Sequence, residues 1–475
     1  MIPDGLGMAL PPHLEERLCT ARRSARPDGA YVMCWLRRTM RADENPVLDM
    51  ARVASRATDR PLFVLMALHE STRWASARHH LFALQCARDL ARQLGEAGVA
   101  MAVHVERTGA RGPVLAPLVR EAALVVVDEV PVAPWREEVE AARVHGPVWS
   151  VDGACVVPMP LSGKAPSRAF VFRDRFADAR SERMGQSWPR EGEPVASALP
   201  ALPFEPVPVA DMEDRDLLGL LEGCAIDHGV APVRTMPGGS RAANARWEAF
   251  RDMRLHEYAD RRNDALDTEG VSGLSPWLNH GCLSPFRVVR EAHAMGGRGA
   301  EKFLDELLVW REVAWHFCWR TPAPEAFDAV PGWARETLLG HASDPRPALH
   351  DLEALAEGRT GDPLWDTAAD CLRHRGMLHN NVRMTWGKGV LRWSPDPETA
   401  LARLIELNHR YALDGRDPAS MGGLLWCLGL FDRPFTPEQP ILGTVRGRGT
   451  AAHAERLDVS AWREVLGLGA RRTAE

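Results

Sequence analysis

The sequence predicts two domains of different fold class, an α/β domain with a Rossmann-like parallel sheet followed by an all-α domain. Three observations lead to this prediction. Short apolar segments, most with β-branched residues, alternate with helical stretches over the first third of the chain. From residue 244 onward the hydrophobic pattern is helical. The chain also has 475 residues, 45% of them hydrophobic, which is enough for two sizeable cores.

The first domain is expected to hold five strands separated by helices. The strands are expected at 30–36, 61–68, 101–105, 124–127 and 148–151, and the helices at 46–55, 76–94 and 112–122. Within 76–94, apolar residues recur every three or four positions and form one face of a helix, and Gly95 is a natural stop. Strands that alternate with helices usually pair in parallel, so we expect a parallel sheet wrapped by helices.

The domain boundaries follow from changes in composition. We expect the α/β domain to span 25–160 and the helical domain to span 236–470. Pro, Gly and charged residues dominate between them, so 161–235 is expected to be an interdomain linker, and a disordered loop fits the same composition. The helices of the second domain are expected at 246–262, 285–294, 300–320, 363–375, 381–393 and 397–408.

Charge and cysteine usage narrow the function classes. The net charge is −6, so a nucleic-acid site has to be a local basic patch on a near-neutral body. Nine cysteines without a C-x-x-C pair predict reduced thiols in a cytoplasmic protein and no metal site. We find no signal peptide at the N-terminus and no apolar stretch near the roughly 20 residues that cross a bilayer. The 16 Trp against 3 Tyr direct attention to where the indoles fall.

The second half carries short segments in a fixed order that together resemble one known family. They are Arg-Asn-Asp at 262–264, Ser-Gly-Leu-Ser-Pro at 272–276, Phe-Leu-Asp-Glu-Leu at 303–307, Trp-Arg-Glu at 310–312, Asp-Pro-Leu-Trp at 362–365, Arg-Met-Thr-Trp-Gly-Lys at 383–388, Leu-Arg-Trp at 391–393, Leu-Asn at 407–408, Arg-Tyr at 410–411, Leu-Asp-Gly-Arg-Asp-Pro at 413–418 and Trp426. This order resembles the FAD-binding domain of class II cyclobutane-pyrimidine-dimer photolyases. Arg-Ala-Asp-Glu-Asn at 41–45 extends the resemblance, which covers about residues 30–460. The chain departs from the family at Trp277, Asn279, His280 and Asn380.

The resemblance implies a light-driven carbon–carbon lyase that repairs pyrimidine dimers in DNA. Excited reduced FAD gives one electron to the dimer and takes it back after the cyclobutane ring splits, so the protein's task is to orient and tune the cofactor. A deazaflavin-type antenna chromophore is a second cofactor that the α/β domain could hold. The partner would be damaged DNA, with no membrane involved, and the protein is expected to be a cytoplasmic monomer.

Three tryptophans are expected to relay electrons from the surface to the flavin. Trp386 and Trp393 are seven residues apart, which places both indoles on one helix face roughly 10 Å apart along the axis. Trp365 lies on the preceding helix. In the family, the positions that match these three residues form the relay that photoreduces the resting flavin. The alternative is ordinary packing of indoles in a core.

Several residues are expected around FAD because they match the family. Arg383 and Asp414 would pair beside the isoalloxazine ring, where a desolvated ion pair sets the local field. Asn408 would face flavin N5, because an amide can donate or accept there. Ser272, Leu274 and Ser275 match the loop that holds the FAD phosphates, and Tyr258, Arg311 and Arg416 complete the set. The alternatives are turn chemistry for Asp414, a helix C-terminus for Asn408 and an N-cap for the serine loop.

A further group is expected to contact the dimer and the DNA. Glu306 and Trp310 are four residues apart and share a helix face. By resemblance this Glu hydrogen-bonds the dimer bases, while this Trp, Met384 and Trp426 flank the flipped dimer. Arg433 and Arg446 match residues that hold the DNA backbone and fill the gap left by the dimer, and Arg448 adds positive charge. An amphipathic helix with an exposed carboxylate and a solvated loop are the alternatives.

Two other functions remain open at this point. One is a cryptochrome-type blue-light photoreceptor with the same fold and flavin. The other is a flavoprotein that binds damaged DNA without repairing it. The presence of the three dimer-contacting positions, Glu306, Trp310 and Trp426, favours repair.

Overall fold

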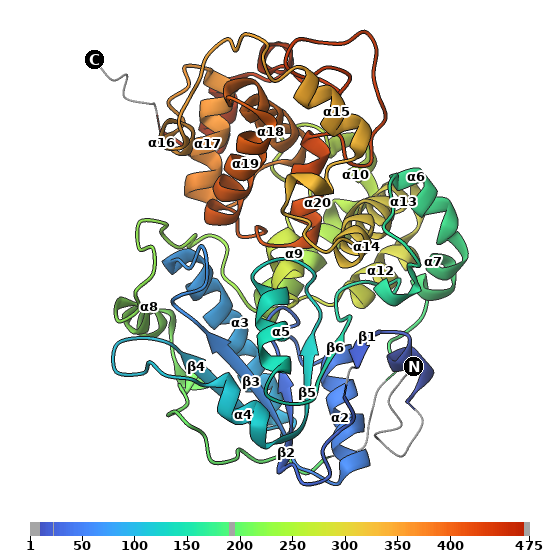
Figure 1. Ribbon diagram of the computed structural model, residues 1–475, viewed down its shortest axis with the longest axis vertical. Helices are drawn as coiled ribbons and strands as arrows, with labels where there is room; N and C mark the ends of the chain where they lie inside the picture. Colours follow the sequence, from blue (N-terminus) through green and yellow to red (C-terminus); the bar gives the residue numbers. More distant parts are fainter. Residues whose placement is uncertain (1–9, 22, 190–194, 470–475) are drawn as a thin grey trace. The chain divides into compact units, whose positions relative to one another are not determined.

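The computed structural model describes residues 10–21, 23–189 and 195–469, and its elements are drawn in Figure 1. The chain forms two compact units, each assembled from separated stretches of sequence. The first contains the chain up to Gly163, Asp178–Glu248 and Leu274–Ala294, and the second contains Lys164–Ala177, Ala249–Gly273 and the chain from Met295 onward.

The first unit holds a six-stranded sheet with the order β1-β6-β5-β2-β3-β4. The strands are β1 (Leu18–Ala21), β2 (Tyr31–Trp35), β3 (Leu62–Leu68), β4 (Met101–Val105), β5 (Ala122–Asp128) and β6 (Val148–Val151). The five strands from β6 to β4 pair in parallel, which confirms the predicted parallel sheet. The edge strand β1 pairs antiparallel with β6 and was not predicted, because its four residues lack a run of apolar β-branched side chains.

The core of this unit explains why the sheet forms here. Every residue of β2 and β5 is buried, as expected for central strands of a parallel sheet with covered faces. Alternate residues of β2, namely Tyr31, Met33 and Trp35, join Phe63 and Val125 in one apolar cluster, as the two-residue period of a strand requires. Helices α2, α3 and α4 contact strands of this sheet (Figure 1).

These helices begin at the predicted residue or up to three residues later, and they end within three residues of the predicted ends. They are α2 (Pro46–Thr58), α3 (Ala77–Glu96) and α4 (Leu115–Glu121). Helix α2 is capped by the Asn45 side chain, which accepts from the backbone of Val47 and Leu48. Helix α3 continues through Gly95, so the predicted stop was wrong, and the first left-handed glycine after it is Gly98.

The remaining helices follow the predicted helical pattern with two clear differences. The predicted helix 246–262 is broken near Arg254 into three pieces, and the predicted helix 300–320 contains a π-helical segment, η4. The segment expected as a linker, 161–235, contains α6, α7, η2 and α8. The bounds are α1 (Pro12–Glu15), α5 (Trp135–Arg143), η1 (Met159–Leu161), α6 (Ala169–Arg175), α7 (Ala177–Met184), η2 (Val209–Asp211), α8 (Asp214–Glu222), α9 (Ser240–Met253), η3 (Leu255–Glu257), α10 (Tyr258–Arg261), α11 (Ser275–His280), α12 (Pro285–Met295), α13 (Gly297–Asp305), η4 (Glu306–Arg311), α14 (Glu312–Arg320), η5 (Phe327–Ala329), α15 (Gly332–Gly340), α16 (Leu352–Glu357), α17 (Pro363–Arg375), α18 (Asn380–Trp393), α19 (Pro397–Tyr411), α20 (Pro418–Cys427), α21 (Thr450–Ala454) and α22 (Val459–Val465).

Two features of the described residues limit the chemistry. Every helix in the described part of the chain is too short or too polar to cross a bilayer. Within the same residues, no cluster of three or more His, Cys, Asp or Glu side chains is arranged to hold a metal ion. All nine cysteines are free thiols, and eight of them are buried.

Candidate active site

Four residues predicted to contact the dimer line one cavity of about 420 Å³ in the second unit. They are Glu306, Trp310, Met384 and Trp426. We call this cavity the indole pocket, and its other lining residues are Arg262, Asn263, Lys302, Ala314, Asn380, Asn381, Ala419, Gly422, Gly423, Phe431 and Arg448. The structure therefore brings together side chains from segments that are up to about 190 residues apart in the sequence. Helical periodicity relates only residues within one helix, so it could not predict this grouping.

The π-helical segment η4 supplies two of these residues. Glu306 is its first residue and Trp310 its fifth. π-Helical turns are rare, and they occur frequently at functional sites. The prediction of one regular α-helix was wrong here, yet Glu306 and Trp310 still lie on the same side and line the same pocket.

Two cations hold the Glu306 carboxylate at the pocket wall. Lys302 Nζ lies 2.7 Å and Arg262 Nη2 lies 2.8 Å from the same oxygen, Glu306 Oε1. Lys302 also contacts Asp305 at 3.0 Å. Burial lowers the pKa of Lys302, but its contacts with Glu306 and Asp305 outweigh burial and raise the pKa above its ordinary value. Lys302 thus stays charged beside the Glu306 carboxylate.

Arg262 and Lys302 were not predicted as site residues. A signal existed for Lys302, because it precedes Glu306 by four residues and therefore lies on the same helix face. Arg262 gave no such signal, since only the tertiary fold brings α10 and α13 into contact.

Two tryptophans form the aromatic part of the indole pocket. The rings of Trp310 and Trp426 have centroids 5.7 Å apart and are inclined by 36°. Trp426 lies near the end of α20, whose small residues Gly422 and Gly423 also line the cavity. A Cβ at Gly422 would lie 2.4 Å from the Cβ of Ala314, so only glycine lets α20 pack this closely on α14.

The predicted flavin pair is present as an ion pair. Arg383 on α18 donates to both carboxylate oxygens of Asp414, at 2.8 and 3.1 Å, and both side chains are largely buried. In the same turn, the Asp417 side chain accepts from the backbone of Ala419 and caps α20. Asp417 therefore caps α20 in this turn, while Asp414, three residues earlier, pairs with Arg383.

Asn408 offers a test of whether these residues fit FAD. It is fully buried on α19, and its amide nitrogen donates to Ser420 Oγ at 2.7 Å. Its amide oxygen has no donor within the described residues. Buried acceptors without a donor are uncommon in proteins, and an N–H of a reduced flavin would satisfy this one. Together with the Arg383–Asp414 pair, this unsatisfied oxygen fits a flavin.

The other predicted cofactor residues lie in different surroundings. Ser272 belongs to the second unit, and Leu274 and Ser275 belong to the first, at the start of α11. Tyr258 is buried between the rings of Phe250 and Phe303, which raises its pKa. Arg311 and Arg416 are also buried, with Arg311 over the Trp315 ring at 5.2 Å and Arg416 in a left-handed backbone conformation. Their contact with FAD stays a prediction.

The three relay tryptophans contact one another in series. The rings of Trp365 and Trp386 are nearly parallel with centroids 5.9 Å apart, and Trp393 meets Trp365 edge-on at 5.5 Å. Trp365 on α17 therefore lies between two indoles of α18. Trp386 and Trp365 are buried, whereas Trp393 is half-buried, so the series leads outward. A Cβ at Gly389 would lie 2.8 Å from Trp365, which makes glycine necessary for this contact.

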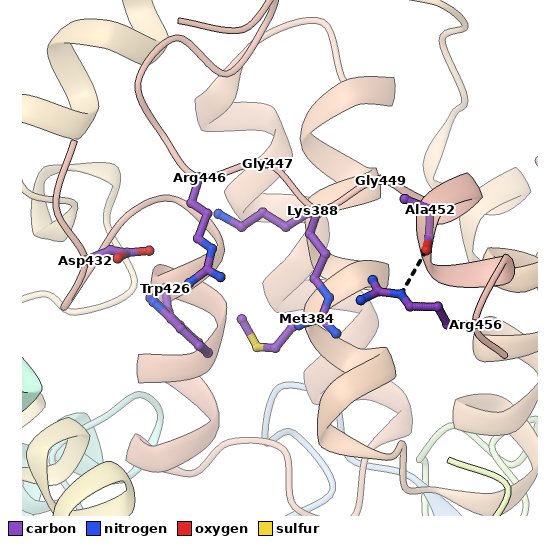
Figure 2. Close-up of a pocket in the computed structure, with 10 residues that line it drawn as sticks. Met384, Lys388, Trp426, Asp432, Arg446, Gly447, Gly449, Ala452 and Arg456 are labelled. Atoms are coloured by element: carbon purple, nitrogen blue, oxygen red, sulfur yellow. Dashed lines mark hydrogen bonds between the residues drawn. The ribbon is translucent and has the colours of Figure 1, made fainter. Parts of the chain in front are cut away.

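A second cavity of about 520 Å³ adjoins the predicted DNA-contacting arginines. We call it the cationic pocket, and it is lined by Met384, Lys388, Trp426, Asp432, Arg446, Gly447, Arg448, Gly449, Ala452 and Arg456. Figure 2 shows the Arg446 side chain extending from its loop toward Trp426, with Met384 between Trp426 and Arg456. The guanidinium groups of Arg433 and Arg446 both lie over the Phe435 ring, at 5.6 and 5.4 Å. Arg433 does not line either cavity.

Comparisons with known proteins agree with this fold and site. The profile described as DNA photolyase matches residues 32–181, and the profile of the FAD-binding domain of DNA photolyase matches residues 303–388. These matches define a class of proteins that joins an α/β domain to a helical FAD-binding domain. A deoxyribodipyrimidine photo-lyase of Oryza sativa is 31% identical over 74% of this chain and 72% of its own length. The chain therefore belongs to the DNA photolyase family.

Other relatives extend the comparison along the chain. A deoxyribodipyrimidine photo-lyase of Methanothermobacter thermautotrophicus is 29% identical over 88% of this chain and 90% of its own length. A class III photolyase from Agrobacterium tumefaciens and a Synechocystis cryptochrome each share the fold with a TM-score of 0.65. They cover 92% of this chain and 86% and 89% of their own lengths, at 18% and 16% identity. At that identity the two structures support the fold alone.

Proposed function

We propose that this chain is a deoxyribodipyrimidine photo-lyase that repairs cyclobutane pyrimidine dimers in DNA with light. The observation that carries the proposal is the indole pocket, where Glu306, Trp310, Met384 and Trp426 line one cavity. An extruded base needs apolar plates for its faces and a few polar groups for its edge. This cavity supplies both, and it belongs to a chain of the photolyase family.

The side chains of the indole pocket would hold the dimer in place before and during ring opening. Trp310 and Trp426 would stack against the bases. Glu306, which pairs with Lys302 and Arg262, is an acceptor and suits the imide N–H edge of a thymine. The same cations would remain close to the dimer when it carries an extra electron, and a preorganised positive field stabilises that charge.

Arg383 on α18, Asn408 on α19 and Asp414 after α19 would hold the cofactor. When bound, reduced FAD would supply the photoexcited electron that opens the cyclobutane ring and would accept it back. The Arg383–Asp414 ion pair would fix the field beside the flavin, and the Asn408 amide oxygen would accept a hydrogen bond from it. No net oxidation or reduction results, so the enzyme is a carbon–carbon lyase.

The proposed relay runs from half-buried Trp393 through Trp365 to buried Trp386. The ring centroids of neighbouring indoles are less than 6 Å apart, and the indoles become more exposed toward Trp393. Both features support an electron path, whereas ordinary core packing requires neither. Photoreduction of oxidised FAD in a Trp386→Phe variant tests it, with Trp319→Phe as the matched control outside the series. The variant should lose photoreduction while the control keeps it. Normal photoreduction in both would remove Trp386 from the path.

A blue-light photoreceptor is the second candidate, and the fold shared with the Synechocystis cryptochrome is what supports it. The intact indole pocket supports repair instead. A related alternative is binding of damaged DNA without repair. Both alternatives predict flavin binding but no restoration of the bases.

We also propose the finer assignments that the resemblance implies. The chain would be of the class II type, act as a monomer in the cytoplasm, and bind a deazaflavin-type antenna in its α/β domain. Free thiols at all nine cysteines are consistent with a reducing compartment. An absorption spectrum of the purified protein tests the antenna, since flavin and antenna bands separate.

The repair experiment uses purified protein with reduced FAD and an oligonucleotide that contains one thymine dimer. Blue light should restore intact thymines, and a dark sample should not. The Glu306→Gln variant under the same light is the matched control for the pocket. Flavin binding without repair in the wild-type protein would overturn the proposed activity and leave the photoreceptor and the non-repairing DNA-binding protein as the alternatives.

A further inference from the structure

A chain of alternating charges runs from α6 to the wall of the indole pocket. Arg173 on α6 donates to Asp305 Oδ1 through Nε at 3.0 Å and through Nη2 at 2.7 Å. The other carboxylate oxygen of Asp305 accepts from Lys302 Nζ at 3.0 Å. Lys302 also contacts Glu306, which pairs with Arg262 at the pocket. All of these side chains belong to the second unit, so the chain of charges lies within one compact body.

Only part of this chain of charges faces the cavity. Arg262, Lys302 and Glu306 line the indole pocket, whereas Asp305 and Arg173 line neither cavity. Asp305 is the last residue of α13 and directly precedes the π-helical segment that begins at Glu306. A base in the cavity would therefore meet Glu306 and Lys302, and Asp305 can act on that base only through its neighbours.

Two carboxylates hold the Lys302 ammonium. Asp305 lies three residues and Glu306 four residues after Lys302, so both carboxylates share its helix face. Burial raises the pKa of Asp305, but its contacts with Lys302 and Arg173 outweigh burial and lower the pKa below its ordinary value. Asp305 is therefore ionised at neutral pH. A lysine ammonium ends a flexible stem, so a second charged partner restricts where it points.

The helix that carries Arg173 has other contacts that fix its place. Arg168, just before α6, forms a backbone bridge with Phe431, which lines the indole pocket. Phe172 on α6 meets the His316 ring of α14 edge-on, with centroids 4.9 Å apart. Arg173 therefore extends from a helix that is held in place without its ion pair.

We propose that Asp305, held by Arg173, is a positioning residue that draws the Lys302 ammonium to one side and leaves Glu306 able to accept from the pyrimidine. The proposal deepens the proposed function and rests on it, because it assumes that Glu306 accepts from the imide N–H of a thymine. With Asp305 present, Lys302 divides its donors between two carboxylates. Without Asp305, every donor of Lys302 turns to Glu306, and the base has to compete with the ammonium for the same oxygens.

A double-mutant cycle tests whether Asp305 acts through Lys302. The proteins are wild type, Asp305→Asn, Lys302→Met and the variant with both changes. The matched control is Asp328→Asn, which neutralises an exposed carboxylate that pairs with Arg335. The ligands are single strands that contain one thymine dimer, with its N3 atoms either unmodified or methylated. Dissociation constants are measured in the dark by fluorescence anisotropy.

We expect Asp305→Asn to weaken binding of the unmodified dimer by roughly twofold to fivefold, the effect of one partly exposed ion pair. The loss should vanish in the Lys302→Met background, which lacks the competing ammonium, and on the methylated dimer, which lacks the imide N–H. Asp328→Asn should bind like the wild type. No loss, an equal loss in both backgrounds or an equal loss on both ligands would overturn the proposal, because a purely structural role of Asp305 depends on neither Lys302 nor N3.

Arg173→Gln is the second variant, for use where Asp305→Asn does not fold. The Arg173 side chain is 40% exposed, so its replacement leaves the core intact. We expect a smaller loss that likewise disappears in the Lys302→Met background and on the methylated dimer. No loss, or a loss that persists in either case, would overturn the proposal.

Light-driven repair of the unmodified dimer is measured on the same wild-type sample. Repair together with equal losses in both backgrounds would overturn the positioning role alone. Dimer binding that shows the expected dependence on Lys302, but without repair in the light, would overturn the proposed activity alone. A wild-type protein that does not bind the dimer would overturn both.

Discussion

The indole pocket and the cationic pocket share a wall but differ in whether their cations pair with a carboxylate. In the indole pocket, Lys302 and Arg262 both pair with Glu306. In the cationic pocket, Lys388 and its three neighbouring arginines have only carbonyl, hydroxyl, amide or aromatic partners among the described residues. Internally paired charge suits a neutral ligand such as a base, because nothing has to be neutralised on binding. Unpaired charge suits an anion that arrives with the ligand.

The largest expected effect comes from breaking the pairing in the indole pocket. Glu306→Gln removes the carboxylate that pairs with Arg262 and, beside Asp305, with Lys302, and it replaces the charged acceptor for the dimer with a neutral amide. We expect repair per absorbed photon to fall by roughly tenfold to 100-fold, since loss of one preorganised polar contact has about that effect. The dependence of dark DNA binding on salt should stay unchanged. Glu357→Gln, at an exposed ion pair, is the control, and a large change in salt dependence would contradict the assignment.

Removing the shared wall should come next. Trp426→Ala deletes a ring that lines both pockets, so the dimer loses a stacking surface. We expect dimer affinity to fall roughly tenfold, since stacking on an aromatic side chain contributes about 1–3 kcal/mol per base. Affinity for undamaged single strands should change much less. Equal losses for damaged and undamaged DNA, measured by anisotropy, would show that Trp426 does not contact the dimer.

The pH dependence of the unfolding free energy tests whether the cationic pocket holds a buried charge. The folded-state pKa of Lys388, about 8, lies below its ordinary value of 10.5. Below pH 8 the folded protein therefore keeps a buried charge, and this cost disappears as the pH rises from 8 toward 10.5. Lys388→Met should be more stable than the wild type at pH 7 by roughly 1–3 kcal/mol, as when a buried charge is replaced by an apolar group.

Urea unfolding at pH 7 and pH 9.5 measures this difference. The stability gain of Lys388→Met should shrink at the higher pH. An equal gain at both values would mean that burial of the charge is not its cause. Lys164→Met should change the unfolding free energy at neither pH, because Lys164 is exposed.

The smallest effect is expected at the rim of the cationic pocket. Arg456→Gln removes one exposed cation, so the slope of log affinity against log salt should drop by about 0.7, the contribution of one phosphate contact on a single strand. Affinity at physiological salt should fall only a few-fold. An unchanged slope would place Arg456 outside the DNA contact.

The sequence analysis identified much of the candidate site one element at a time. Trp365, Trp386 and Trp393 were named before their contacts were known, because helical spacing and the family resemblance select them. What spacing could not supply is the order Trp386–Trp365–Trp393, since Trp365 enters from a different helix and reaches the other two beside Gly389. Arg262 was missed for the same reason, because its partner Glu306 lies 44 residues further along the chain.

Some local roles were decided only by the structure. Asp414 and Asp417 both sit in a turn sequence, and only the structure shows that Asp417 caps α20 while Asp414 pairs with Arg383. The regular helix predicted across 300–320 likewise became π-helical at Glu306–Arg311. Helical periodicity cannot signal a turn that is widened by one residue, because the apolar pattern on either side is nearly unchanged.

By itself, the sequence determined the parallel sheet, the helical second half and membership of a light-dependent DNA-repair family, because hydrophobic period and motif order are local properties of the chain. Only the tertiary structure decided which charges are paired. The Glu306 carboxylate meets two cations while Lys388 meets none of the opposite sign within 4 Å among the described residues. Pairing depends on distances of a few ångströms between separate helices, and the fold alone sets those distances.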